Sequence, residues 1–482
     1  MARYGLFEIR KNDENEYCLK EAREDLAYIV KSNLLATADR ANKRQDGEKE
    51  ITHRICIAFT WSGLKSMALD EKTLHNVPLS LREGMADGTR ATRLGDDKVD
   101  WKWTDKKTED ENGTDRQVHV LVMLFWKISE SASNYSQLNA QDRDGLNEVW
   151  DRMKDGFQGL SCVRTLPDAV VPDDFKGHFG FRDGISQPFV EGSGTSKQPR
   201  NRFAEAHVVK PGNFILGHSN EFGQQVPALW VDESVTSATK HLSRDGLPHR
   251  HRDFGRNGSY LVFRQLRQYP EKFTAFLEQS AANTSYDGPD GQELIAAKLV
   301  GRWKSGAPLT LAPGRDDPTQ STTNDFFYSR TDKHGYKCPI GSHVRRTYPR
   351  DTSVELGAPV GRDEVLSSNR RRRIIRRGRP YQYDVDGDNV GLHFICLNAD
   401  IREQFEFIQE SWVNNRRFGG TRGEVDPIVG SRDPSRSGGE RFTIQRSPIS
   451  EELTLADFVE VVGGGYFFLP SVRALKFLAQ VN

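Results

Sequence analysis

The stretch at residues 178–191, HFGFRDGISQPFVE, centres on Asp183, an acid that stands among aromatic, glycine and small residues. An acid is costly to bury in such surroundings unless it is paired or hydrogen-bonded. Gly180 and Gly184 would let the backbone turn sharply or approach a flat ligand closely. Two interpretations follow: Asp183 only caps a turn, or it is held in a site where it transfers protons.

A second candidate site lies in CPIGSHVRRTYPR, residues 338–350, where Arg345 and Arg346 closely follow His343. A neutral imidazole is a good iron ligand, and its other ring nitrogen needs a partner that fixes its orientation. Nearby guanidinium groups suit the carboxylates of a haem because they can hold them bidentately. The competing interpretation is a structural histidine beside a basic surface.

Arginine dominates a third stretch, NRRRRIIRRGRPYQY at residues 369–383, in which seven of the eleven residues from Asn369 to Arg379 are arginine. Such a run normally indicates nucleic-acid binding or a solvated face. The apolar pair Ile374–Ile375 and then Gly378 interrupt the run. This interruption indicates that part of the run, including Arg376, enters the fold.

Together the three stretches resemble those of the dye-decolourising peroxidases, a haem peroxidase family. The G-x-x-D-G core of that family occurs here as Gly180-Phe181-Arg182-Asp183-Gly184, and an I-I-R-R-G-x-P-Y segment ends at Tyr381. The resemblance covers most of the chain from about residue 150. The long spacing between His343 and Arg376 is similar to that of the larger members. Further matching stretches are PGNFILGHSNEFG at 211–223, RNGSYLVFRQL at 256–266, GLHFICLNADIREQFEFIQESW at 391–412, DPIVG at 426–430 and GGGYFFLP at 463–470.

The resemblance implies one haem b per chain, with His343 as the proximal ligand of its iron. It implies that Asp183 is the distal acid and Arg376 the distal arginine, while the neighbouring Arg377 competes for the second role. Asp426, in the DPIVG stretch, would accept a hydrogen bond from the other ring nitrogen of His343. An acid before proline is, however, often only a turn residue.

Leu392 and Phe394 are two residues apart in an expected strand at 391–396, so their side chains point to the same face. The family places such apolar residues over the distal haem, where they restrict access to molecules as small as peroxide; core packing is the alternative. Bulky dyes would then be oxidised through surface aromatics, although ordinary packing competes with this role. The candidates by position are Trp412, Tyr381 and Tyr383.

The order of expected elements favours an α+β fold with an antiparallel sheet. Apolar residues at helical spacing predict helices at 20–38 and 140–155, and alternation predicts strands at 54–60 and 117–128. The polar segment 88–116 is expected to be an excursion from the fold.

The resemblance implies two ferredoxin-like domains. The first, residues 1–204, would contribute the GFRDG segment to the distal face, and the second, residues 205–482, would bind the haem. The Gly-, Ser- and Pro-containing segment 192–202 is the expected linker between them.

The composition excludes few partners. Lys and Arg number 68, as do Asp and Glu, so the formal net charge is zero and no global electrostatic partner is implied. Zero net charge also disfavours a nucleic-acid binder built on the arginine run. Five cysteines without a C-x-x-C pair offer no zinc site or redox dithiol and favour a reducing compartment.

The chain shows no secretory signal core, no twin-arginine motif and no run of the ~20 apolar residues that span a bilayer. We therefore predict a cytoplasmic protein without a membrane partner, although a removed leader would be invisible. PSVRALKFLA at 470–479 is expected to close the fold as a helix, with no tail for docking inside a protein shell.

These features predict a haem-dependent peroxidase that reduces hydrogen peroxide and oxidises dyes, phenolics and other bulky aromatic substrates through a ferryl intermediate. The alternative is a haem-binding or haem- and iron-delivery protein, which needs His343 but has no use for Asp183 and Arg376. The sequence leaves open the physiological reductant, any oxidation of manganese, and whether the protein is a monomer or a dimer.

Overall fold

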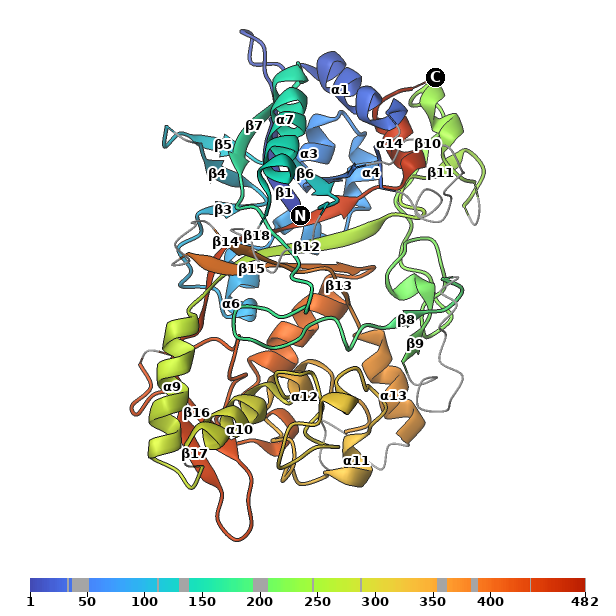
Figure 1. The fold of residues 1–482 in the computed structure, drawn as a ribbon. Helices are drawn as coiled ribbons and strands as arrows, with labels where there is room; N and C mark the ends of the chain where they lie inside the picture. The colour runs from blue at the N-terminus through green and yellow to red at the C-terminus, as the bar shows by residue number, and fades with distance from the viewer. Residues whose placement is uncertain are drawn as a thin grey trace.

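The computed structural model describes most of the chain, and one large sheet runs through its middle with helices beyond it on both sides (Figure 1). The described residues are 1–32, 34–36, 52–110, 112–129, 138–193, 207–244, 247–286, 288–352, 362–382, 389–433 and 435–481. Within them, no helix combines the length and the apolar character that crossing a bilayer requires.

Twelve strands form the main sheet. They are β1 (Ala2–Ile9), β2 (His53–Phe59), β3 (Trp103–Thr104), β4 (Lys107–Glu109), β5 (Asp115–Gln117), β6 (Val120–Trp126), β7 (Leu160–Thr165), β12 (Ser259–Gln268), β13 (Ile375–Arg376), β14 (Arg379–Gln382), β15 (Val390–Asn398) and β18 (Val459–Leu469). Eight strands follow one antiparallel path, β13-β15-β12-β18-β2-β6-β1-β7. Strand β14 pairs with β15, and β3 pairs with β18 in parallel.

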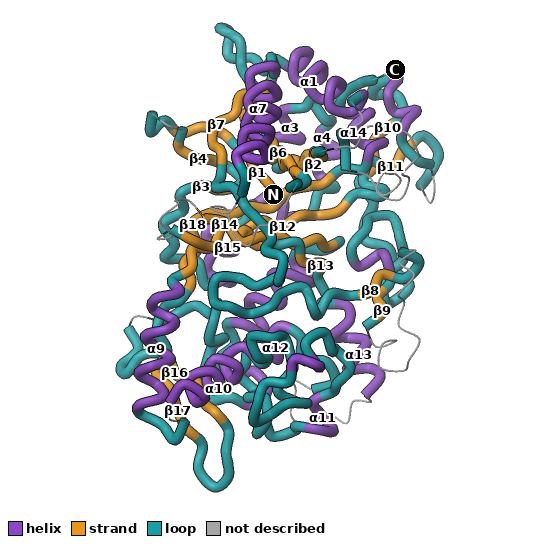
Figure 2. Tube along the Cα trace, viewed as in Figure 1, coloured by secondary structure: helices purple, strands orange, loops and turns teal. Residues whose placement is uncertain are grey.

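Helices lie on both sides of this sheet (Figure 2). Those of the first half are α1 (Leu19–Lys31), α3 (Trp61–Ser66), α4 (Glu71–His75), α5 (Leu79–Glu83), α6 (Gly88–Leu94) and α7 (Ala140–Gly156). Those of the second half are α9 (Pro270–Ala282), α10 (Gly288–Val300), α11 (Tyr328–Thr331), α12 (His343–Thr347), α13 (Arg362–Arg371) and α14 (Val472–Leu478). Two segments, η5 (Arg402–Glu406) and η6 (Ile408–Val413), are π-helical, a rare conformation that often marks functional sites.

Shorter elements lie outside the main sheet and its helices. They are the strand pairs β8 (Phe189–Val190) with β9 (Val208–Val209), β10 (Trp230–Asp232) with β11 (His251–Asp253) and β16 (Arg441–Ile444) with β17 (Glu451–Thr454), and the 3-10 turns η2 (Pro211–Asn213), η3 (Ser237–His241), η4 (Pro318–Gln320) and η7 (Phe418–Gly420).

Both faces of the sheet are buried, because successive residues of a strand point to opposite faces. In β6, Val122 and Leu124 belong to one apolar core, whereas Leu121 and Met123 belong to another. This explains why residues 117–128 are nearly continuously apolar rather than alternating with polar residues. The predicted α+β class with an antiparallel sheet is confirmed.

Most of the expected elements are present. The strands expected at 54–60 and 117–128 are β2 and β6, and the helix expected at 140–155 is α7. The helix expected at 20–38 is too long, since α1 ends at Lys31 and Ser32 has an extended backbone.

The expectation that residues 88–116 form an excursion is wrong. The segment contains α6 and the strands β3 to β5, and β3 joins the main sheet beside β18. Trp103, in β3, is almost fully buried and its indole N–H donates to the Gln265 side chain at 2.8 Å. Trp103 is therefore a core residue, and Trp101 is partly buried against the core.

The sheet continues from the first half of the chain into the second, because β2 and β18 pair at Phe59 and Phe468. Helix α14 lies beside α1, and both contribute to the same apolar core (Figure 1). The division into domains at residues 204 and 205 stays a prediction, and the expected linker at 192–202 lies mostly outside the described residues.

Candidate active site

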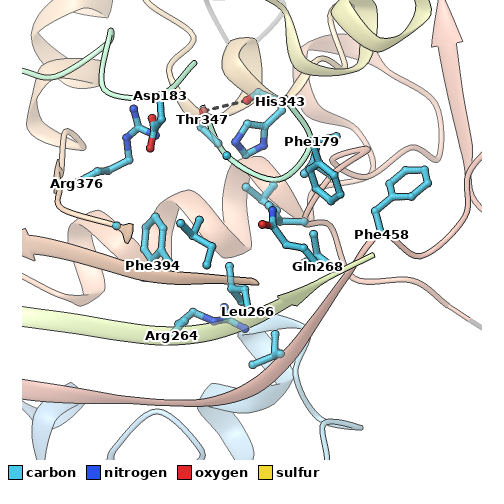
Figure 3. A pocket seen from close by; sticks show the side chains of 18 of the residues that line it. Phe179, Asp183, Arg264, Leu266, Gln268, His343, Thr347, Arg376, Phe394 and Phe458 are labelled. Carbon is cyan, nitrogen blue, oxygen red and sulfur yellow. Dashed lines mark hydrogen bonds and ion pairs between the residues drawn. The ribbon is translucent and has the colours of Figure 1, made fainter. Parts of the chain in front are cut away.

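A cavity of about 1300 Å³ lies between the C-terminal strands of the sheet and the helices packed against them (Figure 3). Leu266 from β12 and Leu392 and Phe394 from β15 line one wall, so the predicted shared face of Leu392 and Phe394 is confirmed. Phe179 and Phe458 line another part. Such apolar walls suit a flat, largely apolar ligand.

His343 opens α12, and its imidazole lines this cavity (Figure 3). Its Nδ1 lies 2.9 Å from a carboxylate oxygen of Asp426, a side chain that is 0% exposed. The other oxygen of Asp426 accepts the backbone N–H groups of Ile428 and Val429. Burial raises the pKa of the Asp426 carboxyl, but His343 and the N–H donors outweigh it and hold the pKa below its usual range. With Nδ1 as the donor, Nε2 keeps its lone pair for a ligand in the cavity.

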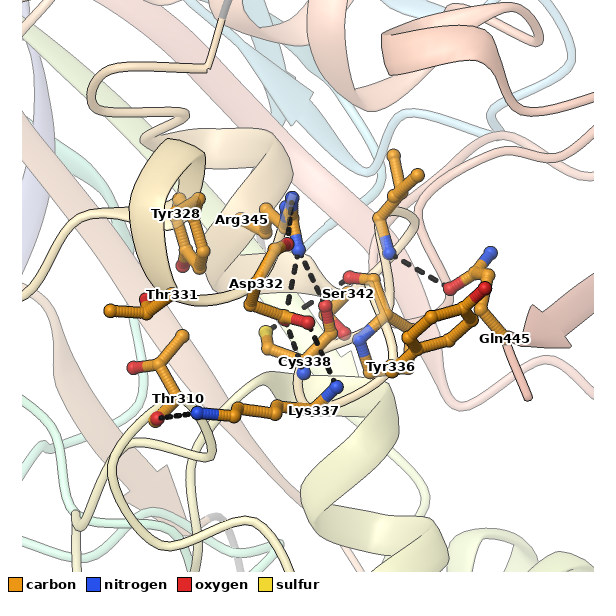
Figure 4. A network of polar contacts seen from close by, with 12 residues as sticks. Thr310, Tyr328, Thr331, Asp332, Tyr336, Lys337, Cys338, Ser342, Arg345 and Gln445 are labelled. Atoms are coloured by element: carbon orange, nitrogen blue, oxygen red, sulfur yellow. Dashed lines mark hydrogen bonds and ion pairs between the residues drawn. The ribbon is translucent and has the colours of Figure 1, made fainter. Parts of the chain in front are cut away.

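A buried polar network fixes the backbone that carries His343 (Figure 4). The Arg345 guanidinium donates to the Asp332 carboxylate at 3.1 Å and to the Cys338 carbonyl at 2.7 Å. The same carboxylate accepts the Cys338 backbone N–H at 2.7 Å. The turn before α12 is thereby tied to the helix itself.

The structure corrects the expectation that Arg345 and Arg346 hold haem carboxylates. Both are buried, and neither lines the cavity. The guanidinium of Arg346 donates to four backbone carbonyls, those of Gly341, Trp412, Asn415 and Glu424. These two arginines therefore stabilise the fold around α12.

Asp183 lies in a loop in which Gly180 and Gly184 have φ angles of +80° and +82°, values that favour glycine. Its Oδ1 lies 2.9 Å from Nη1 of Arg376 and accepts the Gly184 backbone N–H at 2.6 Å. The Asp183 side chain is nevertheless 51% exposed, and it lines the cavity. The Arg376 guanidinium holds the pKa of the Asp183 carboxyl below its usual range, and burial only partly opposes this.

Arg376, rather than Arg377, meets Asp183. Gln187 fixes the backbone of Arg376 from both sides, accepting its N–H at 3.1 Å and donating to its carbonyl at 3.2 Å. Arg377 is exposed, and its guanidinium donates to the Arg376 carbonyl. The geometry thus decides between two residues that the sequence left open.

The arginine run enters the fold in the way its interruption predicted. Arg370 pairs with Glu221 and Arg372 with Glu403, which neutralises the first part of the run. Arg373 is buried and donates to the Ser186 carbonyl, and Arg376 reaches the cavity.

Sequence reasoning missed two buried cations, Arg302 and Arg373, that line the cavity without an acidic partner among the described residues. Arg302 donates to the carbonyls of Gly306 and Thr323 and to the side chain of Asn324, and no described carboxylate pairs with it. Burial, and then the neighbouring Arg350, lower the pKa of Arg302 to about 9. Nη1 of Arg373 is buried and has no hydrogen-bond partner among the described residues. Of these two residues, only Arg373 could be noticed in the sequence, because it belongs to the arginine run.

The aromatic residues expected at the surface are not found there. Trp412 is buried against Phe407, and Tyr381 is buried against His393. The expectation of a surface position is therefore wrong for both residues. Tyr383 lies outside the described residues.

No protein-family model matches the chain. It is 31% identical over 362 residues to a dye-decolorizing peroxidase of Mycena epipterygia, a match that covers 66% of this chain and 61% of that relative. It is 34% identical over 347 residues to multifunctional dye peroxidase DyP2 of Amycolatopsis sp., a match that covers 66% of this chain and 63% of that relative. The matches thus span less than two thirds of these relatives.

Solved structures agree over nearly the whole chain. A dye-decolorizing peroxidase in complex with 2,6-dimethoxyphenol is similar with a TM-score of 0.70 at 25% identity, covering 99% of this chain and 95% of that one. A DyP-type peroxidase of Anabaena sp. has the same fold, with a TM-score of 0.71 at 21% identity over 99% and 91%. The chain belongs to the dye-decolourising peroxidase family.

Proposed function

We propose that the protein is a haem-dependent peroxidase that reduces hydrogen peroxide and oxidises dyes, phenolics and other bulky aromatic compounds. The observation that carries this proposal is the Asp183–Arg376 pair, which borders the same cavity as His343. Cleavage of peroxide needs a group that moves a proton and a fixed positive charge near the departing oxygen. The peroxidase names of the relatives support the same activity.

The residues around the cavity fit haem b, one per chain. His343 offers Nε2 as an axial ligand, and the apolar walls match the faces of a macrocycle. The unpartnered Nη1 of Arg373 and the unneutralised Arg302 suit carboxylates at the edge of such a group. The sequence has no C-x-x-C-H motif for covalent haem attachment.

Bound haem supplies the iron at which the O–O bond of peroxide is reduced. The Asp183 carboxylate accepts a proton from peroxide and returns it to the departing oxygen, which leaves as water. Arg376 stays charged and stabilises the negative charge that develops on that oxygen. Leu392 and Phe394 limit the space beside this pair, so that a small molecule such as peroxide fits there.

The test separates this function from haem or iron delivery, which requires His343 but neither Asp183 nor Arg376. Haem-loaded protein is mixed with one equivalent of hydrogen peroxide in a stopped-flow spectrometer, followed by a phenol. For a peroxidase, the haem spectrum changes within milliseconds and the phenol restores it over many cycles. A delivery protein would show slow bleaching or loss of iron without turnover of the phenol.

A further inference from the structure

Phe175 has an unusual conformation at the rim of the cavity. Its side chain is 52% exposed although it contributes to the cavity wall, and its backbone φ is +58°. A bulky side chain is unfavourable in this left-handed region, because its Cβ crowds the following carbonyl. Such a conformation persists only where neighbouring contacts hold it, and these contacts often belong to functional sites.

The contacts that hold Phe175 come from the loop that carries Asp183. The Asp183 backbone N–H donates to the Phe175 carbonyl at 2.9 Å, and Lys176 and Arg182 form an antiparallel bridge between these two points. The Arg182 guanidinium lies 6.0 Å from the centre of the Phe175 ring. The exposed ring is therefore fixed beside a cation, a few residues from the distal acid.

Two of the three cations at this end of the cavity, Arg182 and Arg377, have no carboxylate partner among the described residues. Lys176, Arg182 and Arg377 all contribute to the cavity wall. No carboxylate of the described residues lies within ion-pair distance of Arg182 or Arg377, and Lys176 has only a 3.8 Å contact with Asp174. Asp183 itself pairs with Arg376.

The other end of the cavity, around Phe458, mixes both signs of charge. In Figure 3, Phe458 lies far from Arg376 along the cavity. Next to Phe458 in the chain, Asp457 lies 3.5 Å from Arg432, while Lys272 lies over the ring of Tyr269, whose hydroxyl donates to Glu460. Charges of both signs thus lie near Phe458, whereas Arg182 and Arg377 have no acidic partner among the described residues.

We propose that Phe175, Lys176 and Arg182 form a docking site for anionic aromatic reductants, phenols that carry a sulfonate or a carboxylate. The substrate ring stacks on the exposed face of Phe175, and its anionic group meets Arg182 and Lys176. This inference rests on the proposed peroxidase function. Each docked phenol gives up one electron and one proton, so two phenols become phenoxyl radicals as one peroxide becomes two waters.

The experiment compares two phenols of similar size and opposite charge, 4-hydroxybenzenesulfonate and tyramine. The measured quantity is the ratio of their kcat/KM values for the haem-loaded enzyme at low ionic strength. The double variant Lys176→Gln/Arg182→Gln should lower this ratio about tenfold, since two partly exposed cations each contribute a few-fold. Phe175→Leu keeps an apolar side chain but loses the ring, and should lower both kcat/KM values about threefold.

The matched control is Lys272→Gln, which removes one positive charge at the other end of the cavity. The ratio should stay within about twofold of the parent value, because the Lys272 ammonium lies 4.0 Å from the centre of the Tyr269 ring rather than beside Phe175. An unchanged ratio in the double variant, or an equal fall in Lys272→Gln, would overturn the docking site.

Haem content and melting temperature establish that each variant is folded. If the double variant does not fold, Lys176→Gln alone and added salt give the same test, because both should lower the ratio. If neither Lys176→Gln nor added salt changes the ratio, the docking site is rejected. A parent enzyme that oxidised neither phenol would instead reject the proposed peroxidase function.

Discussion

His343, which pairs with Asp426, borders the same cavity as the Asp183–Arg376 pair, and the paired atoms are 2.9 Å apart in both pairs. Their surroundings differ. Asp426 is fully buried and holds two backbone N–H groups in addition to His343, whereas the Asp183 side chain is half exposed. Equal distances thus occur in two very different environments.

These environments suit different roles in the proposed function: Asp426 can hold His343 in place, whereas Asp183 can transfer a proton. In the proposed function, Asp426 orients the His343 ring and increases its basicity as a ligand, since the other Asp426 oxygen is occupied by two backbone N–H donors. The open side of Asp183 leaves an oxygen accessible to a small molecule in the cavity, and Arg376 keeps that oxygen ionised. Burial and access, rather than the length of a hydrogen bond, therefore distinguish the two carboxylates.

The largest expected effect follows from removing His343, the partner of the buried Asp426. His343→Ala should retain less than about a tenth of the parent haem, because an axial iron ligand is lost. Haem content is measured from the Soret absorbance against protein concentration. An unchanged spectrum would transfer the ligand role to His178, which also lines the cavity.

The substitution Asp183→Asn tests the partly exposed pair of Asp183 and Arg376. The amide cannot accept a proton from peroxide, so the reaction with peroxide should slow by roughly 10²-fold or more. The haem content should match that of the parent, and stopped-flow absorbance gives the rate. A parent-like rate would mean that water or Arg376 moves the proton.

Asp426→Asn tests whether the buried carboxylate acts only through His343. The amide is similar in size but carries no charge, so haem affinity or turnover should fall about 10- to 100-fold. The Fe–histidine stretching frequency of the ferrous protein should also fall, because a neutral partner makes the imidazole a weaker donor. A frequency equal to that of the parent would remove Asp426 from this role.

The smallest effect concerns pH. Arg376 lowers the pKa of Asp183, so the carboxylate stays ionised in solutions more acidic than a free aspartate tolerates. Arg376→Gln removes this charge, and the acid-side loss of the peroxide reaction rate should move to higher pH. Stopped-flow rates across an acidic pH series measure the shift. Superimposable profiles would show that Arg376 does not influence the titration of Asp183.

The sequence predicted site residues in short motifs and in one strand better than residues that tertiary packing brings to the cavity. Asp183 and His343 each stand in a short stretch of unusual composition, and the alternation in residues 391–396 correctly placed Leu392 and Phe394 on one face. Arg302 could not be found this way, because it reaches the cavity through tertiary packing far from either stretch.

The error at Arg345 and Arg346 has a simple geometric cause. Residues four apart share a helix face, whereas residues two apart do not. Arg346, three positions on, is held inside the protein by the four backbone carbonyls that it binds. Accordingly, Thr347 lines the cavity with His343, while Arg345 and Arg346 turn into the protein. Proximity in sequence does not imply a shared direction, and the helical period shows this for Arg345.

The position of β18 in the sheet bears on how the protein is made. This strand follows every other strand of the main sheet in the sequence, yet it lies between β12 and β2. A nascent chain that has not yet released residues 459–469 from the ribosome lacks both the join between the two halves of the sheet and part of the cavity wall. In the proposed function, stable haem binding therefore follows translation of β18.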